Sequence, residues 1–153
     1  MAKKATAKAA SGASTAAAGY SGTPLVKKLG IKAGDVVALH GAPPHYRTLL
    51  GELPPGVTFR EGGSGAAPFV HCFTASRAEL SKLLPKLAKS IFPAGTLWIS
   101  WPKKTSPLAA DLDENGVREL VLPSGLVDVK VCAVDADWSG HKFVWRKELR
   151  GGQ

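Results

Sequence analysis

Short apolar runs alternate along the chain with segments in which apolar residues recur at helical spacing. Three runs have the length of strands, at residues 36–39, 69–73 and 96–101. Continuous apolar runs of this length are typical of strands buried on both faces of a sheet. We therefore predict three core strands, the last of them central, and a weaker strand at residues 57–59.

The strongest helical pattern follows the second run. Ser76 and Glu79 have the spacing of a capping box, which predicts that the helix begins at Ser76. Pro85 predicts a kink or a restart, because proline has no N–H to donate within a helix. The apolar face consists of Leu80, Leu83, Leu84, Leu87 and Ile91.

Three shorter helices are predicted at residues 23–30, at 45–53 and from Asp111, a suitable cap, to about residue 122. The runs 126–134 and 142–145 indicate an antiparallel hairpin that closes one edge of the sheet. Strands that alternate with helices imply right-handed parallel crossovers. The expected fold class is α/β, a three-layer sandwich with a mostly parallel sheet and a C-terminal antiparallel hairpin.

Composition sets the boundaries of this fold. Residues 1–19 are almost entirely Ala, Lys, Ser, Thr and Gly, which do not bury enough apolar surface to become ordered. We expect a disordered tail at residues 1–19, a single domain at 20–150 and a disordered end at 151–153.

The net charge of +8 favours anionic partners, although solubility alone also explains it. If the partner is nucleic acid, two basic segments offer a surface, the tail and the outer face of the 76–91 helix. Their residues are Lys3, Lys4 and Lys8 in the tail and Arg77, Lys82, Lys86 and Lys89 on the helix.

Cysteine use and hydropathy indicate the compartment. Cys72 and Cys132 form neither a disulfide framework nor a C-x-x-C pair, as expected in a reducing environment. The N-terminus lacks the apolar core of a signal peptide, and no run approaches the roughly 18 apolar residues of a membrane span. We expect a cytoplasmic protein that does not bind a membrane.

Ligands of open α/β sheets bind beyond the carboxyl ends of the strands. If the 36–39 and 96–101 strands are neighbours, the residues that follow them converge on one crevice, suited to an anionic ligand with a ring that can stack. The alternative is that Trp98 and Trp101 are core residues and the lysines are solvated. The candidate ligand residues are His40, Gly41, Ser100, Trp101, Lys103 and Lys104.

Other chemical motifs are incomplete. The glycines of residues 62–65 lack the Gly-Lys-Ser/Thr ending of a P-loop, and the calcium-like run 111–116 has Leu122 where a glutamate should stand. His71 and Cys72 are adjacent in a strand, so they face opposite ways and do not share a metal. Ser100 lacks the Gly-x-Ser-x-Gly turn of a hydrolase. We expect no catalytic residues, metal or cofactor.

From residue 20 to residue 146 the chain resembles a bacterial family of unknown function, frequent among actinobacteria. The matching stretches are Tyr20-Ser21-Gly22-Thr23-Pro24-Leu25, Lys28-Leu29-Gly30-Ile31, Leu97-Trp98-Ile99-Ser100-Trp101-Pro102-Lys103, residues 125–135 and Trp138-Ser139-Gly140. This resemblance implies the domain boundaries and no activity.

A looser resemblance is to class I methyltransferases with Rossmann-like folds, carried by Phe92-Pro93-Ala94-Gly95-Thr96-Leu97. Those enzymes have a glycine-rich loop after the first strand, where this chain has Gly41-Ala42-Pro43-Pro44, and the two prolines lack amide donors.

The sequence thus leaves the function open between three classes. The hypothesis we favour at this stage is a non-catalytic binding or interaction module, for an anionic small ligand or a protein partner. The alternatives are a nucleic-acid-binding protein and a degenerate methyltransferase-like transferase.

Overall fold

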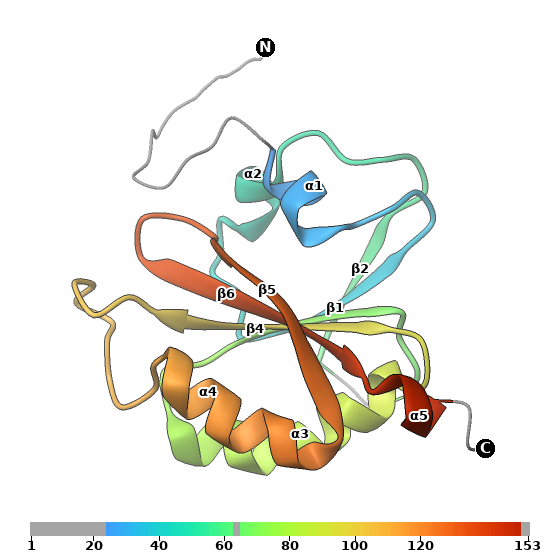
Figure 1. The fold of residues 1–153 in the computed structure, drawn as a ribbon. Coiled ribbons are helices and arrows are strands. Elements are labelled where there is room, and N and C mark those ends of the chain that lie inside the picture. Colours follow the sequence, from blue (N-terminus) through green and yellow to red (C-terminus); the bar gives the residue numbers. More distant parts are fainter. Residues whose placement is uncertain (1–23, 63–64, 151–153) are drawn as a thin grey trace.

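A single six-stranded sheet forms the centre of the computed structural model, which describes residues 24–62 and 65–150 (Figure 1). Four neighbouring strands are parallel, and two antiparallel strands complete the sheet. In spatial order they are β2 (Thr58–Glu61), β1 (Val36–His40), β3 (Phe69–Phe73), β4 (Thr96–Pro102), β6 (Trp138–Trp145) and β5 (Leu126–Ala133). The predicted α/β class, with a mostly parallel sheet and a C-terminal hairpin, is confirmed.

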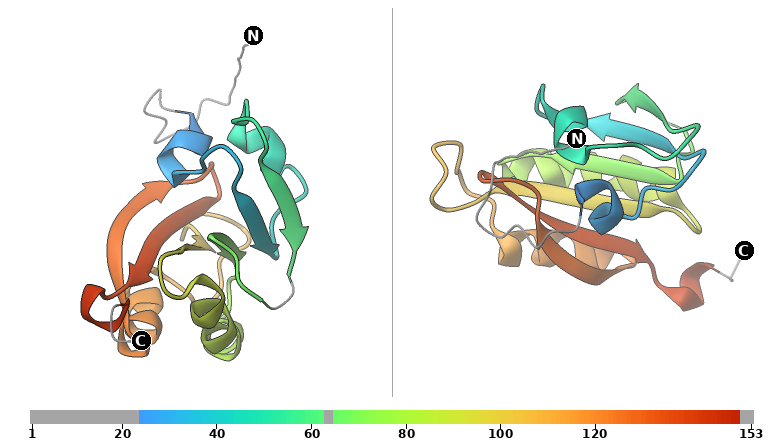
Figure 2. Two further views of the ribbon diagram at one scale, coloured as in Figure 1. Left: turned by 90° about the vertical axis from the view of Figure 1, so that its right-hand side faces the viewer. Right: turned by 90° about the horizontal axis from the view of Figure 1, so that it is seen from above.

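Helices cover both faces of the sheet, which gives the three predicted layers (Figures 1 and 2). The upper face of Figure 1 carries α1 (Leu25–Leu29) and α2 (Tyr46–Leu50). The lower face carries α3 (Arg77–Ile91), α4 (Glu114–Val121) and the short η1 (Leu122–Ser124), and α5 (Lys147–Arg150) follows β6. We use "upper face" and "lower face" in this sense below.

The alternation of side chains along β3 shows how the core divides. Val70 and Cys72 join the cluster packed by α3 and α4, whereas Phe69 and Phe73 join the cluster packed by α1 and α2. His71 lies two residues from both Phe69 and Phe73 in β3, so it faces the same way, and its ring stacks on that of Phe73. It therefore points to the upper face. The prediction that His71 and Cys72 face opposite ways is confirmed.

The long helix α3 follows the sequence pattern closely. Ser76 Oγ accepts a hydrogen bond from the Glu79 N–H at 3.1 Å, and the predicted leucine face is turned toward the sheet. The helix runs on through Pro85 without a restart. Pro85 and Ser81 are exposed, so water can satisfy the Ser81 carbonyl that proline leaves without a donor.

Several element boundaries differ from the prediction, among them those of α1, α4 and β6. Asp113 caps α4, with Oδ1 accepting from the Gly116 N–H at 2.8 Å, while Asp111 instead accepts from the Arg77 N–H of α3 at 2.9 Å. Pro24 occupies the N-cap position of α1, so the helix begins at Leu25, whereas the predicted helix begins at residue 23. Strand β6 begins at Trp138, and it lies inside the sheet because it pairs with both β4 and β5.

A chain of buried hydrogen bonds links the upper helices to the sheet. Tyr46 Oη lies 2.9 Å from His71 Nδ1, and His71 Nε2 lies 2.7 Å from Ser100 Oγ. Trp98 Nε1 donates to the Leu29 carbonyl at 2.9 Å. Burial lowers the pKa of His71 to about 3, so the ring is neutral and uses one nitrogen as donor and the other as acceptor. Burial also raises the pKa of Tyr46.

Two further expectations concern the ends of the chain and membrane-spanning helices. The predicted tail at residues 1–19 and the end at 151–153 lie outside the described residues. Within residues 24–62 and 65–150, no helix is long and apolar enough to cross a membrane.

The buried imidazole predicts a pH dependence of stability. His71 titrates near pH 6.5 in the unfolded chain and near pH 3 in the folded one, so only the unfolded chain gains this proton between those values. The contribution of His71 is complete above pH 6.5 and falls by about 1.4 kcal/mol per pH unit as the pH drops toward 3. His71→Gln, which keeps a donor and an acceptor but does not titrate, should lose this part of the slope.

Urea unfolding at several values between pH 4 and pH 7 measures both slopes. His40 and His141 also have lowered pKa values, so a smaller slope remains in the variant. Equal slopes for the parent and His71→Gln would contradict the burial of a neutral imidazole.

Candidate functional site

The carboxyl ends of the four parallel strands meet at one edge of the sheet, which we call the carboxyl edge. The chain passes from β1 outward to β2 and then returns to β3 on the other side of β1. The strand order therefore reverses between β1 and β3, and crevices at such switch points hold the ligands of open α/β sheets.

On the upper side, the switch point is filled by protein atoms. A Cβ on Gly41, where φ is +70°, would lie only 2.6 Å from the Phe73 carbonyl oxygen, so β1 and β3 approach closely here. The Phe73 ring packs edge-on against Tyr46 and Trp138, with ring centroids 5.6 Å and 5.0 Å away. Aromatic packing thus closes the upper side of the edge at β3.

A hydrogen bond reinforces this closure. His45, at the end of the loop that follows β1, places Nε2 3.1 Å from Asp135 Oδ2 in the turn between β5 and β6. Asp135 Oδ1 accepts from the backbone N–H groups of Asp137 and Trp138, which fixes the carboxylate. The loop after β1 is therefore tied to the hairpin turn across the ends of β3 and β4.

The ends of β1 and β2 carry a group of ionisable side chains, which we call the His40 cluster. It consists of His40, Arg60, Glu61 and Lys86. His40 is half-buried at the end of β1, and Glu61 is exposed at the end of β2. Burial, followed by the charges of Lys86 and Arg60, lowers the pKa of His40, and Glu61 opposes the shift. The imidazole is therefore neutral near pH 7.

Arg60 provides an unused donor in this cluster. Its Nη2 and Nη1 donate to the carbonyls of Gly65 and Ala66, at 3.2 Å and 3.5 Å. Its Nε is buried and has no partner among the described residues. A buried N–H without an acceptor is unfavourable, so a ligand oxygen at this place would be stabilised.

The six predicted ligand residues are divided between two places in the fold. His40 and Gly41 end β1, whereas Ser100 and Trp101 are buried within β4. The strands they follow are not neighbours, because β3 lies between β1 and β4. Lys103 is half-buried, with its N–H donating to the Asp137 carbonyl at 2.8 Å, and Lys104 is exposed. Trp98 is fully buried as well.

The basic residues predicted for nucleic-acid binding do not form one continuous surface in the described residues either. Lys3, Lys4 and Lys8 lie outside the described residues. Lys82, Lys86 and Lys89 are exposed along α3, and Lys86 reaches the His40 cluster. Arg77 is paired with Glu119, with Nη2 and Oε1 2.8 Å apart, so its charge is partly compensated.

The sequence did not identify Arg60 or Glu61 as candidate site residues, or His71 as the partner of Ser100. Glu61 had a usable signal, since it comes twenty positions after Gly41, about the spacing at which a dinucleotide-binding fold places its ribose-binding acid. Arg60 and the pairing of Ser100 with His71 depend on strand register, which no local pattern reveals.

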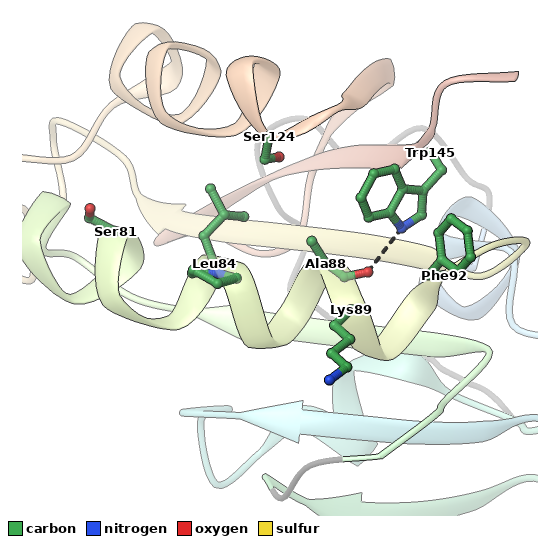
Figure 3. Close-up of a pocket in the computed structure, with 8 residues that line it drawn as sticks. Ser81, Leu84, Ala88, Lys89, Phe92, Ser124 and Trp145 are labelled. Carbon is green, nitrogen blue, oxygen red and sulfur yellow. Dashed lines mark hydrogen bonds between the residues drawn. The ribbon is translucent and has the colours of Figure 1, made fainter. Parts of the chain in front are cut away.

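A hollow lies elsewhere, on the lower face between α3, η1 and the end of β6 (Figure 3). It has a volume of about 670 Å³ and a mostly apolar lining that includes Leu84, Phe92 and Trp145. Trp145 Nε1 donates to the Ala88 carbonyl at 2.9 Å, and Lys89 points away from Trp145 (Figure 3). The lining also includes Ser81, Lys89 and Ser124. The described residues contain no group of three or more His, Cys, Asp or Glu side chains that could hold a metal ion.

Comparison with solved structures places the fold among known α/β proteins. A SAM-dependent methyltransferase from Aquifex aeolicus superposes with a TM-score of 0.55 at 16% identity, over 78% of this chain and 86% of that chain. The N-methyltransferase NodS from Bradyrhizobium japonicum gives 0.52 at 9% identity, over 80% and 93%. A possible exported protein from Bordetella parapertussis gives 0.56 at 11% identity, over 78% and 65%.

These likenesses show a Rossmann-like α/β fold that SAM-dependent methyltransferases also have, which is consistent with the looser resemblance in the sequence. No protein-family model and no curated protein matches the chain. The resemblance to a bacterial family of unknown function therefore stays a prediction.

The close approach at Gly41 can be tested with a matched glycine. Gly41→Ala should destabilise the fold by about 1–3 kcal/mol more than Gly34→Ala, because both alanines adopt a positive φ but only the Cβ at position 41 meets backbone. Gly34, with φ of +79°, has nothing within 4 Å of the added Cβ. Free energies of unfolding from urea titration measure the difference, and equal losses would show that the switch point is open.

Proposed function

We propose that the domain binds S-adenosylmethionine at the ends of β1 and β2 and acts as a methyltransferase-type domain. The observation that carries the proposal is the position of Glu61 at the carboxyl end of β2, in register with Leu39 of the neighbouring parallel strand β1 and twenty positions after the turn at Gly41. In sheets of this kind, an acid about 20 residues beyond the first turn accepts hydrogen bonds from a ribose. The shared fold with SAM-dependent methyltransferases supports the choice of ligand.

The His40 cluster fits the polar groups of this ligand. Glu61 is exposed and its carboxylate can accept hydrogen bonds from both ribose hydroxyls. Arg60, with its unpaired Nε, and Lys86 suit the carboxylate of the ligand's amino-acid part. The ligand thus matches the one acid and the basic groups of the cluster.

The loop after β1 fits the same ligand. Pro43 and Pro44 remove two of the backbone donors with which a glycine-rich loop would hold a pyrophosphate. S-adenosylmethionine carries no phosphate, so the loss of these two donors weakens its binding less than it would weaken the binding of a dinucleotide. The loop is unsuited to binding a dinucleotide but is compatible with S-adenosylmethionine.

When bound, S-adenosylmethionine supplies an electrophilic methyl group. In the proposal, Glu61 and Arg60 leave opposite faces of β2 and hold the ribose and the amino-acid part of the ligand across the end of the strand, while the aromatic closure around Phe73 excludes water from one side. His40 is neutral near pH 7 and can take up a proton that a methyl acceptor releases. These are roles of binding, orientation and proton uptake at one edge of the sheet.

Isothermal titration of the full chain with S-adenosylmethionine tests the proposal. Glu61→Gln should weaken binding about 10- to 100-fold, because a hydrogen bond to a charged group contributes about 1.5–3 kcal/mol. Glu52→Gln is the matched control, since Glu52 is an exposed carboxylate on the loop before β2 that takes no part in the His40 cluster, and it should bind like the parent.

A third variant, Lys103→Gln/Lys104→Gln, tests the site expected from sequence at the end of β4. It should bind like the parent if the ligand lies at β1 and β2. A loss in this variant, with Glu61→Gln unaffected, would move the ligand to the end of β4. No binding by the parent at millimolar ligand would contradict the proposal altogether.

A further inference from the structure

The upper face carries a group of lysines that have no part in the His40 cluster. Lys130 of β5 and Lys142 of β6 stand directly opposite each other in the antiparallel register. Lys142 is also opposite Trp98 of β4, whose side chain belongs to the upper cluster. Because residues in register on adjacent strands share a face, both lysines lie on the upper face.

Helix α1 and the segment after it bring two more lysines to the same place. A Cβ on Gly30 would lie 3.8 Å from Lys142 Nζ, so this ammonium reaches the C-terminal end of α1. Lys28 and Lys130 both act electrostatically on the thiol of Cys132, and Lys32 acts on Lys142. We call these four residues, Lys28, Lys32, Lys130 and Lys142, the lysine face.

The charge of the lysine face is not compensated at its centre. Burial, followed by the charges of Lys130 and Lys32, lowers the pKa of Lys142, and no carboxylate of the described residues opposes that shift. Asp35 accepts from the backbone N–H of Lys32 at 2.9 Å and is not among the groups that act on Lys142. An ammonium ion held among other ammonium ions attracts anions.

The opposition of Lys130 and Lys142 lowers the stability of the sheet, and sheet pairing alone does not explain it. Like charges directly opposite each other on neighbouring strands are destabilising. Lys130 alone has a structural reason, because a lysine and a β-bulge on the edge strand β5 discourage pairing with another sheet. Lys142 lies in an interior strand, where no such protection is needed, and only its place at the C-terminal end of α1 favours a cation there. A local conflict of this kind is expected where the residues serve binding.

We propose that the lysine face binds the phosphate backbone of a nucleic acid, independently of base sequence. Lysine is a compact point charge that neutralises phosphates without a fixed geometry, so a cluster of lysines suits a flexible chain of phosphates. Membrane surfaces are held by basic residues next to Trp, Phe or Leu, whereas the large exposed apolar residues of β5 are Val127, Val129 and Val131. The surface is separate from the basic outer side of α3, which lies on the lower face.

The test uses the full chain and a fluorescein-labelled oligothymidylate of about 20 nucleotides, longer than the usual site of about 4–16 nucleotides. Fluorescence anisotropy gives the affinity at several salt concentrations. Lys130→Gln/Lys142→Gln should reduce the slope of log K against log salt by about 1.4, or about 0.7 for each phosphate that is no longer neutralised. Lys82→Gln/Lys89→Gln removes the same charge from α3 and should leave the slope near that of the parent.

Thermal melting separates a loss of binding from a loss of folding. Removing the Lys130–Lys142 repulsion should raise the melting temperature of the first variant by about 1–3 °C. An unchanged salt slope in this variant, a larger change in the α3 variant, or binding of the parent to phosphatidylserine vesicles but not to the oligonucleotide would each overturn the proposal. Binding of S-adenosylmethionine is measured separately, and neither lysine pair includes a residue of the His40 cluster.

Discussion

The need to satisfy buried polar groups on the upper face determines how this fold is assembled. Helices α1 and α2 each have five residues, too few to be stable alone in water. Both are held by bonds to the sheet, α2 through Tyr46 to His71 and α1 through the Leu29 carbonyl to Trp98. A buried donor or acceptor without a partner costs about 1–3 kcal/mol, so these bonds strongly disfavour other positions of the two helices.

The position of α2 then decides which part of the carboxyl edge is open. Because Tyr46 is bound to His71, the residue before it, His45, lies where it can reach Asp135 in the hairpin turn. Phe73 and Trp138 pack against each other at the same end of the sheet, with ring centroids 5.0 Å apart. The upper side of the edge at β3 is closed as a result, and the ionisable groups that remain gather around His40 at the ends of β1 and β2.

Local patterns in the sequence predicted most of the elements but not their arrangement. The leucine spacing and Ser76 predicted α3, and the apolar runs predicted β1, β3 and β4. Asp111 and Asp113 both precede α4 and both suit a cap, so only the competing bond from Asp111 to α3 identifies Asp113. Strand order is a long-range property, which is why the insertion of β3 between β1 and β4, and the meeting of Lys130 with Lys142, could not be foreseen.

The central claim is that an adenosine ligand occupies the ends of β1 and β2, and hydrogen exchange of the full chain with and without S-adenosylmethionine tests it most directly. Bound ligand should slow amide exchange at residues 40–42 and 60–62, beside the His40 cluster, with little change at residues 103–106 after β4. Protection confined to residues 103–106, or no protection at a saturating concentration, would contradict it.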